Sequence, residues 1–203
     1  KTIVKKNGSY QLIESASRHQ VPDTIQGIVA GRMDRLEDNI KTTLQMASVI
    51  GRKFVFRILK TLPGLSEEIK TYLLRLQSLE FIYEKRIFPE LEYIFKNIIT
   101  QEVAYNSLLL NRRREIHGNI GTAIEEMYSD RLEEFYEIIA HHFGESDNHA
   151  TAIKYLKLSG DKATYNNSAW EAFEFYKKAF ALLEQHSEGF EQKKNSHENK
   201  GYD

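Results

Sequence analysis

The residues of this chain that could perform chemistry are few and widely spaced. The 203 residues include no Cys, which excludes disulfides, thiolate metal sites and a cysteine nucleophile. The sequence has neither a Walker-type nor a Gly-x-Gly-x-x-Gly phosphate-binding loop, and no Gly-x-Ser-x-Gly turn that would present a serine nucleophile. We therefore expect this chain to be non-catalytic and to hold no cofactor of its own.

The best candidates for metal ligands are His141, His142, Glu145 and His149. On a continuous helix His142 and Glu145 lie three positions apart and share a face, and His149 could follow one turn later. Gly144 predicts a helix end inside this group, and the sequence lacks the His-Glu-x-x-His pattern of zinc enzymes. We therefore expect no metal site, and we expect one of the adjacent residues His141 and His142 to pack inside the protein.

The basic run of the sequence is Arg112, Arg113 and Arg114. Such a run could contact the phosphates of a nucleotide or nucleic acid, or a partner protein. Consecutive residues on a helix fan out by about 100° each, so three arginines cannot form one flat patch. The alternative is a solvated helix face on which one Arg pairs with a carboxylate such as Glu115 or Glu102.

The composition predicts a mainly helical chain located in the cytoplasm. The 28 basic and 29 acidic residues give a net charge of only -1, so the chain lacks the basic surplus that many nucleic-acid binders carry. The hydrophobic fraction of 41% is sufficient for a core, and only 3 Pro and 11 Gly interrupt the pattern. No stretch of 18 apolar residues occurs, so we expect no membrane span. The chain begins at Lys1 without an initiator Met, which we interpret as the edge of a longer protein.

The elements that must position these residues fall into four predicted parts. Residues 1–20 form two short strands around Asn7-Gly8, a pair suited to a tight hairpin turn. Residues 21–98 read as three helices and a β-hairpin, the order of a winged-helix domain. Residues 99–186 form α-helical hairpins, and residues 187–203 are polar and without periodicity, which predicts a disordered tail.

Within residues 21–98 the first helix begins near Asp23 and the second ends near Gly51. A short apolar helix spans Phe54 to Leu62, and the third long helix opens at Ser66. The period then changes to that of strands, which are expected over Phe81 to Arg86 and Leu91 to Lys96.

The last two predicted helices carry small residues at regular spacing with aromatic residues between them. The small residues include Gly160, Ala163, Ala172 and Ala179, and Tyr176 lies among them. This arrangement is what a tetratricopeptide-like helical hairpin requires, although ordinary packing of two helices is the alternative. Because such hairpins stack on one another, a single pair is either the cap of an array or part of a truncated array. We favour truncation, because the apolar face of the pair would otherwise remain open.

Two segments carry a resemblance to a known family. The first is Val21-Pro22-Asp23-Thr24-Ile25-Gln26-Gly27-Ile28-Val29-Ala30-Gly31-Arg32-Met33-Asp34-Arg35-Leu36, continuing to Ala47-Ser48-Val49-Ile50-Gly51-Arg52-Lys53-Phe54. The second is Phe95-Lys96-Asn97-Ile98-Ile99-Thr100-Gln101-Glu102-Val103-Ala104-Tyr105-Asn106-Ser107-Leu108-Leu109, followed by Arg113-Arg114-Glu115-Ile116-His117. Together they resemble the region that follows the ATPase module in large signalling ATPases of the STAND class. Those most similar combine class III adenylate/guanylate cyclase domains, an AAA-like ATPase and tetratricopeptide repeats, and the resemblance covers about residues 1–185.

The resemblance implies the order of the parts and their partners. Residues 1–20 would be the end of the ATPase lid, followed by a winged helix and the first helices of a repeat array. ATP and Mg²⁺ would bind in an upstream module of the parent protein. The implied partners are that ATPase module, downstream repeats of the same chain and other proteins, whereas neither nucleic acid nor a membrane is expected.

Asn97 is the candidate for nucleotide sensing that the resemblance singles out. The family commonly has a His after Phe-Lys at the end of the wing strand, in a position similar to a phosphate-sensing His. Asn can donate a hydrogen bond to phosphate but cannot add a positive charge. The structural alternative is that Asn97 caps the helix that starts near Ile98.

The leading hypothesis is a non-catalytic regulatory fragment that couples the nucleotide state of a cyclase-associated ATPase to protein–protein interaction. One alternative is a winged-helix transcriptional regulator that binds DNA. Against it, the predicted third helix begins with Glu67 and Glu68, where phosphates would approach. A further alternative is a scaffold that binds a peptide in a groove between helical repeats.

Overall fold

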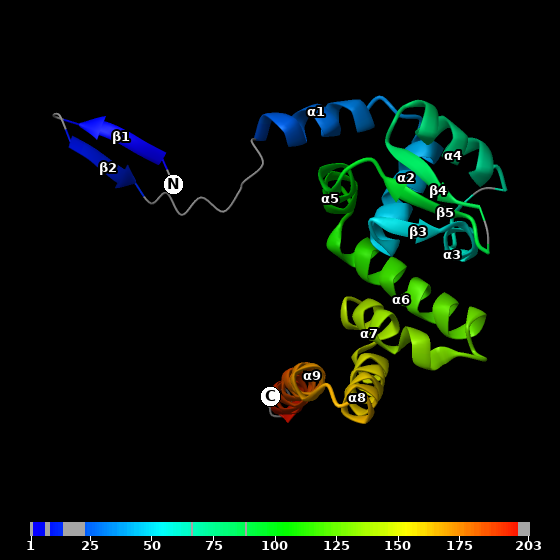
Figure 1. Cartoon of the computed structure of the whole chain (residues 1–203). Coiled ribbons are helices and arrows are strands. Elements are labelled where there is room, and N and C mark those ends of the chain that lie inside the picture. The colour runs from blue at the N-terminus through cyan, green and yellow to red at the C-terminus, as the bar shows by residue number, and fades with distance from the viewer. Residues whose placement is uncertain (1, 7–8, 14–22, 66, 88, 199–203) are drawn as a thin grey trace.

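The computed structural model describes residues 2–6, 9–13, 23–65, 67–87 and 89–198, with side chains described from residue 25 to residue 185 of these ranges. The protein is mainly helical and contains a small antiparallel sheet (Figure 1), which confirms the prediction of a mainly α fold. At the N-terminal end, β1 (Thr2–Lys6) pairs with β2 (Ser9–Ile13) in antiparallel register. The predicted Asn7-Gly8 turn lies outside the described residues.

The first unit of the fold combines helices with a three-stranded sheet. Its elements are α1 (Asp23–Met33), α2 (Asp38–Ile50), β3 (Lys53–Val55), α3 (Phe56–Thr61), α4 (Ile69–Ser78), β4 (Ile82–Arg86) and β5 (Glu92–Phe95). The strands are antiparallel in the order β3-β5-β4. Ser66, at which the third long helix was predicted to begin, lies outside the described residues.

The short strand β3 corrects the prediction of a helix over 54–62. Phe54 pairs with Tyr93 of β5, and its ring stacks on the Tyr93 ring with centroids 5.6 Å apart. Phe54 is buried while its neighbour Lys53 is exposed, which is the alternation of a half-buried strand. The helix α3 therefore begins only at Phe56.

The core of the first unit lies between the sheet and helices α2, α3 and α4. Leu44, Leu59, Leu73 and Leu76 are almost completely shielded from solvent, as is Ile82 of β4. These residues come from four different elements, and burying them supplies the main driving force for folding the unit.

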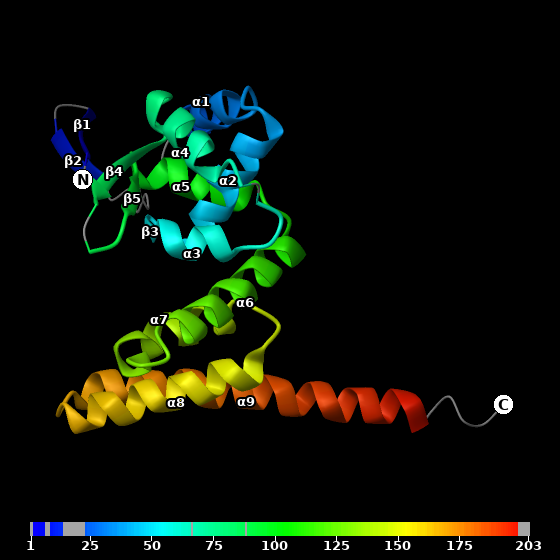
Figure 2. The same ribbon diagram turned by 90° about the vertical axis from the view of Figure 1, so that its right-hand side faces the viewer.

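Two helices connect this unit to the rest of the chain. α5 (Ile98–Asn106) packs against α1 and α2, so this helix lies with the first unit although the sequence pattern placed residues 99–186 together. α6 (Leu110–Met127) contacts α2 and α3 on one side and α7 on the other. Figure 2 shows α6 between the sheet-containing unit and the last helices.

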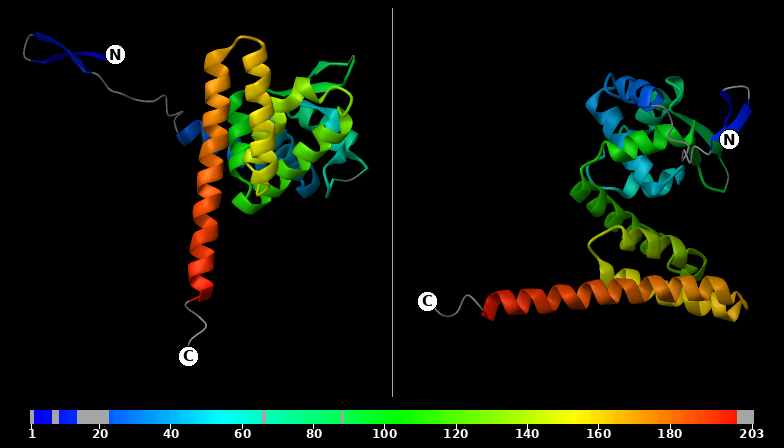
Figure 3. Two further views of the ribbon diagram at one scale, coloured as in Figure 1. Left: turned by 90° about the horizontal axis from the view of Figure 1, so that it is seen from below. Right: turned by 90° about the vertical axis from the view of Figure 1, so that its left-hand side faces the viewer.

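The second unit is a stack of helices. After α6 come a 3₁₀ turn (Leu132–Phe135), α7 (Tyr136–Gly144), α8 (His149–Tyr165) and α9 (Ala169–Glu198). Helices α8 and α9 lie side by side in antiparallel directions (Figure 3). The chain reverses at Asn167, which has a φ of 58°, a left-handed conformation that Asn tolerates better than most residues.

Helix α9 extends through residues that the sequence predicted to be a disordered tail. The prediction placed disorder over 187–203, whereas the helix ends at Glu198; residues 199–203 lie outside the described residues. The segment has no Pro, and its Glu, Gln and Lys residues are good helix formers. High polarity argued for disorder, but a polar sequence can also continue a helix that packing has already nucleated.

Candidate functional site

Asn97 lies at the first position before α5 and caps that helix. Its side-chain Oδ1 accepts hydrogen bonds from the backbone N–H of Thr100, at 2.8 Å, and from the Thr100 hydroxyl, at 2.9 Å. This is the geometry of an N-cap, in which a side-chain oxygen satisfies one of the free amide groups of the first turn. The residue predicted for nucleotide sensing therefore has a structural role in this fold.

The three arginines of the basic run diverge, as the helical geometry of α6 requires. Arg112 pairs with Glu115 at 2.7 Å, and Arg114 pairs with Asp147 at 3.3 Å. Arg113 lies over the ring of Tyr105, with 4.8 Å between the guanidinium carbon and the ring centroid. No single phosphate could contact all three guanidinium groups in this arrangement.

The residues considered as metal ligands do not converge. His142 is buried, with 2% of its surface exposed, whereas Glu145 is exposed at the end of α7 and His149 begins α8. Within the part of the chain that the structure describes, no set of three His, Cys, Asp or Glu side chains is placed to hold a metal ion.

His142 instead belongs to a chain of hydrogen bonds that crosses three helices. Its Nδ1 lies 2.9 Å from Nδ1 of His117 on α6, and Nε2 of His117 lies 3.1 Å from the hydroxyl of Tyr105 on α5. His141 adds a third imidazole, whose ring meets that of His117 edge to face at 5.8 Å. We call Tyr105, His117 and His142 the Tyr-His-His chain.

Burial controls the protonation of the two imidazoles in the Tyr-His-His chain. Loss of solvent lowers the pKa of His117 to about 4, with smaller contributions from His141 and Arg113. The pKa of His142 is lowered for the same principal reason, burial, and by the neighbouring imidazoles of His117 and His141. Both rings are therefore neutral at pH 7, and each can donate one hydrogen bond and accept another.

The exposed edge of the Tyr-His-His chain opens into a pocket between the two units. This pocket, which we call the inter-unit cleft, has a volume of about 440 Å³. Ser48, Val49, Ile50 and Gly51 at the end of α2, Gln101, Glu102, Tyr105 and Asn106 of α5, His117 of α6, and His141 and Glu145 of α7 form its lining. Ser48 and Val49 are buried, while Glu102, Asn106, His141 and Glu145 are exposed.

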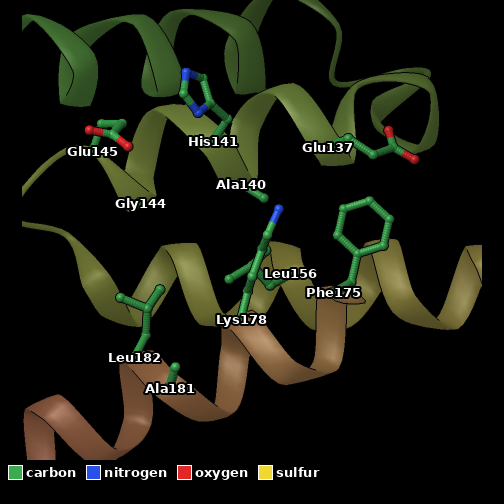
Figure 4. Close-up of a pocket in the computed structure, with 10 residues that line it drawn as sticks. All are labelled: Glu137, Ala140, His141, Gly144, Glu145, Leu156, Phe175, Lys178, Ala181 and Leu182. Atoms are coloured by element: carbon green, nitrogen blue, oxygen red, sulfur yellow. The ribbon is translucent and has the colours of Figure 1, made fainter. Parts of the chain in front are cut away.

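A second depression lies on the other side of α7. This groove, with a volume of about 360 Å³, is formed by α7, α8 and α9 and is lined largely by apolar groups that include Ala140, Leu156 and Phe175. Figure 4 shows Lys178 reaching from α9 toward α7, while His141 points away from α8 and α9. Glu137, at the end of this groove, is paired with Lys162 at 3.0 Å.

The outer face of α9 exposes a row of large apolar side chains. Trp170 is 73% exposed, Phe173 54%, Phe180 61% and Leu183 51%. The buried face of the same helix carries Ala172 and Ala179, which allow α8 to approach closely. These side chains lie on one helix rather than scattered over the surface.

The prediction from sequence missed Tyr105 and His117 as site residues, whereas His141 was considered only as a metal ligand. Tyr105 and His117 lie within the segments that carry the family resemblance. Helical spacing gave no reason to bring them together with His141, because the three residues come from three helices whose packing the sequence pattern does not define.

None of the helices in the described part of the chain has the length and hydrophobicity that crossing a lipid bilayer requires. Comparison of the chain with protein-family models, with curated proteins and with solved structures found no match. The site must therefore be interpreted from its own geometry.

Proposed function

We propose that this chain is a non-catalytic regulatory segment of a multidomain STAND ATPase linked to nucleotide-cyclase signalling. In this role it couples the nucleotide state of an upstream ATPase module to protein–protein interaction through its helices. The single observation that carries the proposal is the exposed apolar row on α9, which includes Phe173, Phe180 and Leu183. Apolar surface of this kind is stabilised when another protein element covers it.

The topology of the first unit supports a winged helix. Helices α2, α3 and α4 pack against the three-stranded sheet. Strand β3 follows α2 in the sequence and pairs with β5, the second strand of the β4–β5 hairpin. This order of helices and strands is typical of a winged-helix domain. In the proposed parent protein this unit would contact the ATPase module.

The second unit supports a helical-repeat assignment. Helices α6 and α7, and α8 and α9, form successive packed pairs. The crossing of α8 and α9 is close at Gly160, where an added Cβ would lie 2.6 Å from the Tyr176 ring. Small residues at helix crossings are typical of tetratricopeptide-like hairpins, and these hairpins stack through the face that α9 leaves exposed.

The charge distribution at α4 disfavours the DNA-binding alternative. Glu67 and Glu68 lie just before the first turn of α4, and Glu68 accepts a hydrogen bond from the Tyr72 hydroxyl. Lys70 lies over the ring of Phe56 instead of standing free, at 5.7 Å from the ring centroid. Acidic groups at this helix start repel a phosphate backbone.

Three measurements on the full chain test the proposal. ATP turnover should not exceed background, and turnover that follows the protein concentration would contradict a non-catalytic role. Gel shifts with duplex DNA at several salt concentrations should show no complex; binding that weakens steeply with salt would favour the transcriptional regulator. Binding of an apolar fluorescent dye should fall by about half in the double variant Phe173→Glu/Phe180→Glu, and should stay unchanged in the control Lys60→Glu, at an exposed position of α3.

A further inference from the structure

Four apolar side chains of α9 form a continuous line along the helix. Phe173, Tyr176, Phe180 and Leu183 follow one another at intervals of three, four and three residues, the spacing that places side chains on one face of a helix and allows a second helix to pack along it. All four are exposed, Tyr176 the least at 40%, and α9 lies at the edge of the helical stack (Figure 3). We call these four residues the α9 seam.

Contacts within the chain hold the aromatic side chains of the seam in place. The hydroxyl of Tyr176 donates a hydrogen bond to Oδ1 of Asp161 on α8, at 2.7 Å, and the Tyr176 ring lies close to Gly160. The Phe173 ring packs beside that of Trp170, with centroids 5.9 Å apart. A surface whose side chains are already ordered loses little conformational entropy when a partner covers it.

The spacing of the seam is self-complementary. When two identical helices pack antiparallel about a two-fold axis, a residue before the axis meets the residue equally far after the axis on the other helix. An axis at position 178 therefore places Phe173 opposite Leu183 of the second copy, and Tyr176 opposite Phe180 of the second copy. Each of these contacts occurs twice, so all four side chains of both seams are covered.

The exposed area of the seam is sufficient for a reversible pair. An aromatic side chain buries about 150–250 Å², so four side chains that are each about half exposed leave roughly 400 Å² uncovered on each copy. With Trp170, which adjoins the seam, two copies would remove on the order of 1,000 Å² from water, which is the lower limit for a specific interface. The area therefore predicts an association that depends on concentration rather than a permanent dimer.

The charges of α9 favour a second copy over a membrane or a strongly charged partner. Its described charged side chains are of both signs, namely Glu171, Glu174, Lys177, Lys178 and Glu184. This helix lacks the Lys and Arg surplus that holds an amphipathic helix on anionic lipid. The net charge of the whole chain is only -1, so two copies repel each other little.

We propose that the α9 seam binds the α9 seam of a second copy of this chain, antiparallel about a two-fold axis near position 178. The inference rests on the role in protein–protein interaction proposed above for the exposed row on α9, and it names the partner. The pair places the two α8–α9 hairpins side by side.

Sedimentation equilibrium of the full chain over a wide concentration range tests the association. The mass should rise from that of one chain to that of two and no further, because a two-fold contact closes on itself. Phe180→Glu should weaken the association at least about tenfold, since each substitution places a charge in the interface twice. Leu74→Glu is the matched control, because Leu74 is equally exposed but lies on α4, and it should leave the association unchanged.

Disulfide formation tests the antiparallel direction, and the absence of Cys in the chain makes every introduced thiol the only one of its kind. In Phe173→Cys/Leu183→Cys the two positions are about 15 Å apart on one helix, too far for a disulfide within a chain. Mild oxidation should nevertheless link two copies, because position 173 faces position 183 of the second copy. Phe173→Cys alone should not link, since the two copies of position 173 lie far apart in an antiparallel pair.

Three results would overturn the proposal. These are the mass of a single chain at every concentration, an association that Phe180→Glu leaves unchanged, and efficient linking by Phe173→Cys alone, which indicates a parallel pair. The dye measurement described above, made where the chain is monomeric, separates this failure from failure of the proposed function. Loss of dye binding in Phe173→Glu/Phe180→Glu without any self-association would keep the row as an interaction surface and assign it to a different protein.

Discussion

Single side chains connect the two units through the Tyr-His-His chain. The bond between Nδ1 of His117 and Nδ1 of His142 holds one proton between two nitrogens, so one ring donates and the other accepts. Whichever ring donates, Nε2 of His117 can accept from or donate to the Tyr105 hydroxyl. A second proton would leave two donors facing each other in a buried place, which is costly.

The buried imidazoles of the Tyr-His-His chain therefore predict that the protein loses stability on mild acidification. The pKa of His117 is about 4 in the folded protein and about 6.5 in an unfolded chain, so the unfolded state binds more protons between these values. Stability is then greatest above pH 6.5 and falls as the pH drops through this window toward 4. For His117 alone the loss from pH 7 to pH 5 should be about 2 kcal/mol in the free energy of unfolding.

Urea denaturation at pH 7, 6 and 5 measures this loss. The variant His117→Gln removes one of the two buried imidazoles and keeps His142, so its stability should depend on pH less steeply than that of the original chain but still decline over the same window. Carboxyl groups whose pKa is lowered, such as that of Glu92 beside Lys85, are present in both chains and therefore contribute equally to both slopes. Equal slopes for the variant and the original chain would contradict the assignment to His117.

Asn97 gives a second prediction at the scale of one residue. Asn97→Ala removes both hydrogen bonds that Oδ1 accepts from Thr100, and should lower the free energy of unfolding by about 1 kcal/mol. Asn97→Asp keeps an acceptor and places a negative charge at the start of α5, so it should retain most of the stability. Urea denaturation of both variants at pH 7 measures these changes. If Asn97 had no structural role, both substitutions would change the free energy of unfolding only slightly and by the same amount.

At the scale of elements, close helix packing depends on a few glycines. A Cβ added at Gly121 of α6 would lie 2.9 Å from the ring of Phe143 on α7, and Phe143 is buried in the core with 2% exposure. At Gly31 of α1, by contrast, nothing lies within 4 Å of an added Cβ. The two glycines are both helical, so they differ mainly in their surroundings.

Gly121→Ala should therefore destabilise the protein by about 1–3 kcal/mol, because the buried ring of Phe143 must shift. Gly31→Ala should be neutral or stabilising by up to about 1 kcal/mol, because Ala favours the helix more than Gly does. Thermal unfolding of the two variants, followed by circular dichroism at 222 nm, provides the comparison. A destabilisation of similar size in both variants would show that helix propensity rather than packing controls Gly121.

The sequence predicted those elements whose hydrophobic period was long and regular. The strands β4 and β5 lie close to their expected positions, and the long helices α6 and α8 lie within residues 99–186, where helical hairpins were expected. β3 was missed because Lys53–Val55 is too short to establish a period, and its partner β5 lies far along the chain. The extension of α9 was missed because polarity was taken as a sign of disorder, although it is equally compatible with a solvated helix.

The inter-unit cleft was less accessible to prediction than the fold. Its polar residues, such as Glu102, His117 and Glu145, come from α5, α6 and α7, and only the crossing of these helices brings them together. The sequence indicated Glu145 and His142 as candidates, but for a metal site based on local spacing. Local spacing identifies residues that share a helix face, whereas this cleft joins ends of separate helices.

At the scale of the whole molecule, α6 determines whether the two units behave as one. It packs against α2 and α3 of the first unit and against α7 of the second. Ile116, Ile120 and Ile124, at intervals of one turn, are buried at 2% exposure or less. A helix whose buried residues belong to a core shared by both units should make their unfolding cooperative.

Ile120→Ala tests this coupling because Ile120 is fully buried. The cavity should lower the free energy of unfolding by about 2–5 kcal/mol. If α6 couples the units, one unfolding event exposes the amides of both α2 and α7. Their hydrogen exchange in Ile120→Ala should then be faster than in the original chain by the same factor. Thr122→Ala, at an exposed position of the same helix, should change the exchange of neither. Faster exchange confined to α7, α8 and α9 would show that the second unit opens alone, and that a signal passing between the units must use contacts other than those of α6.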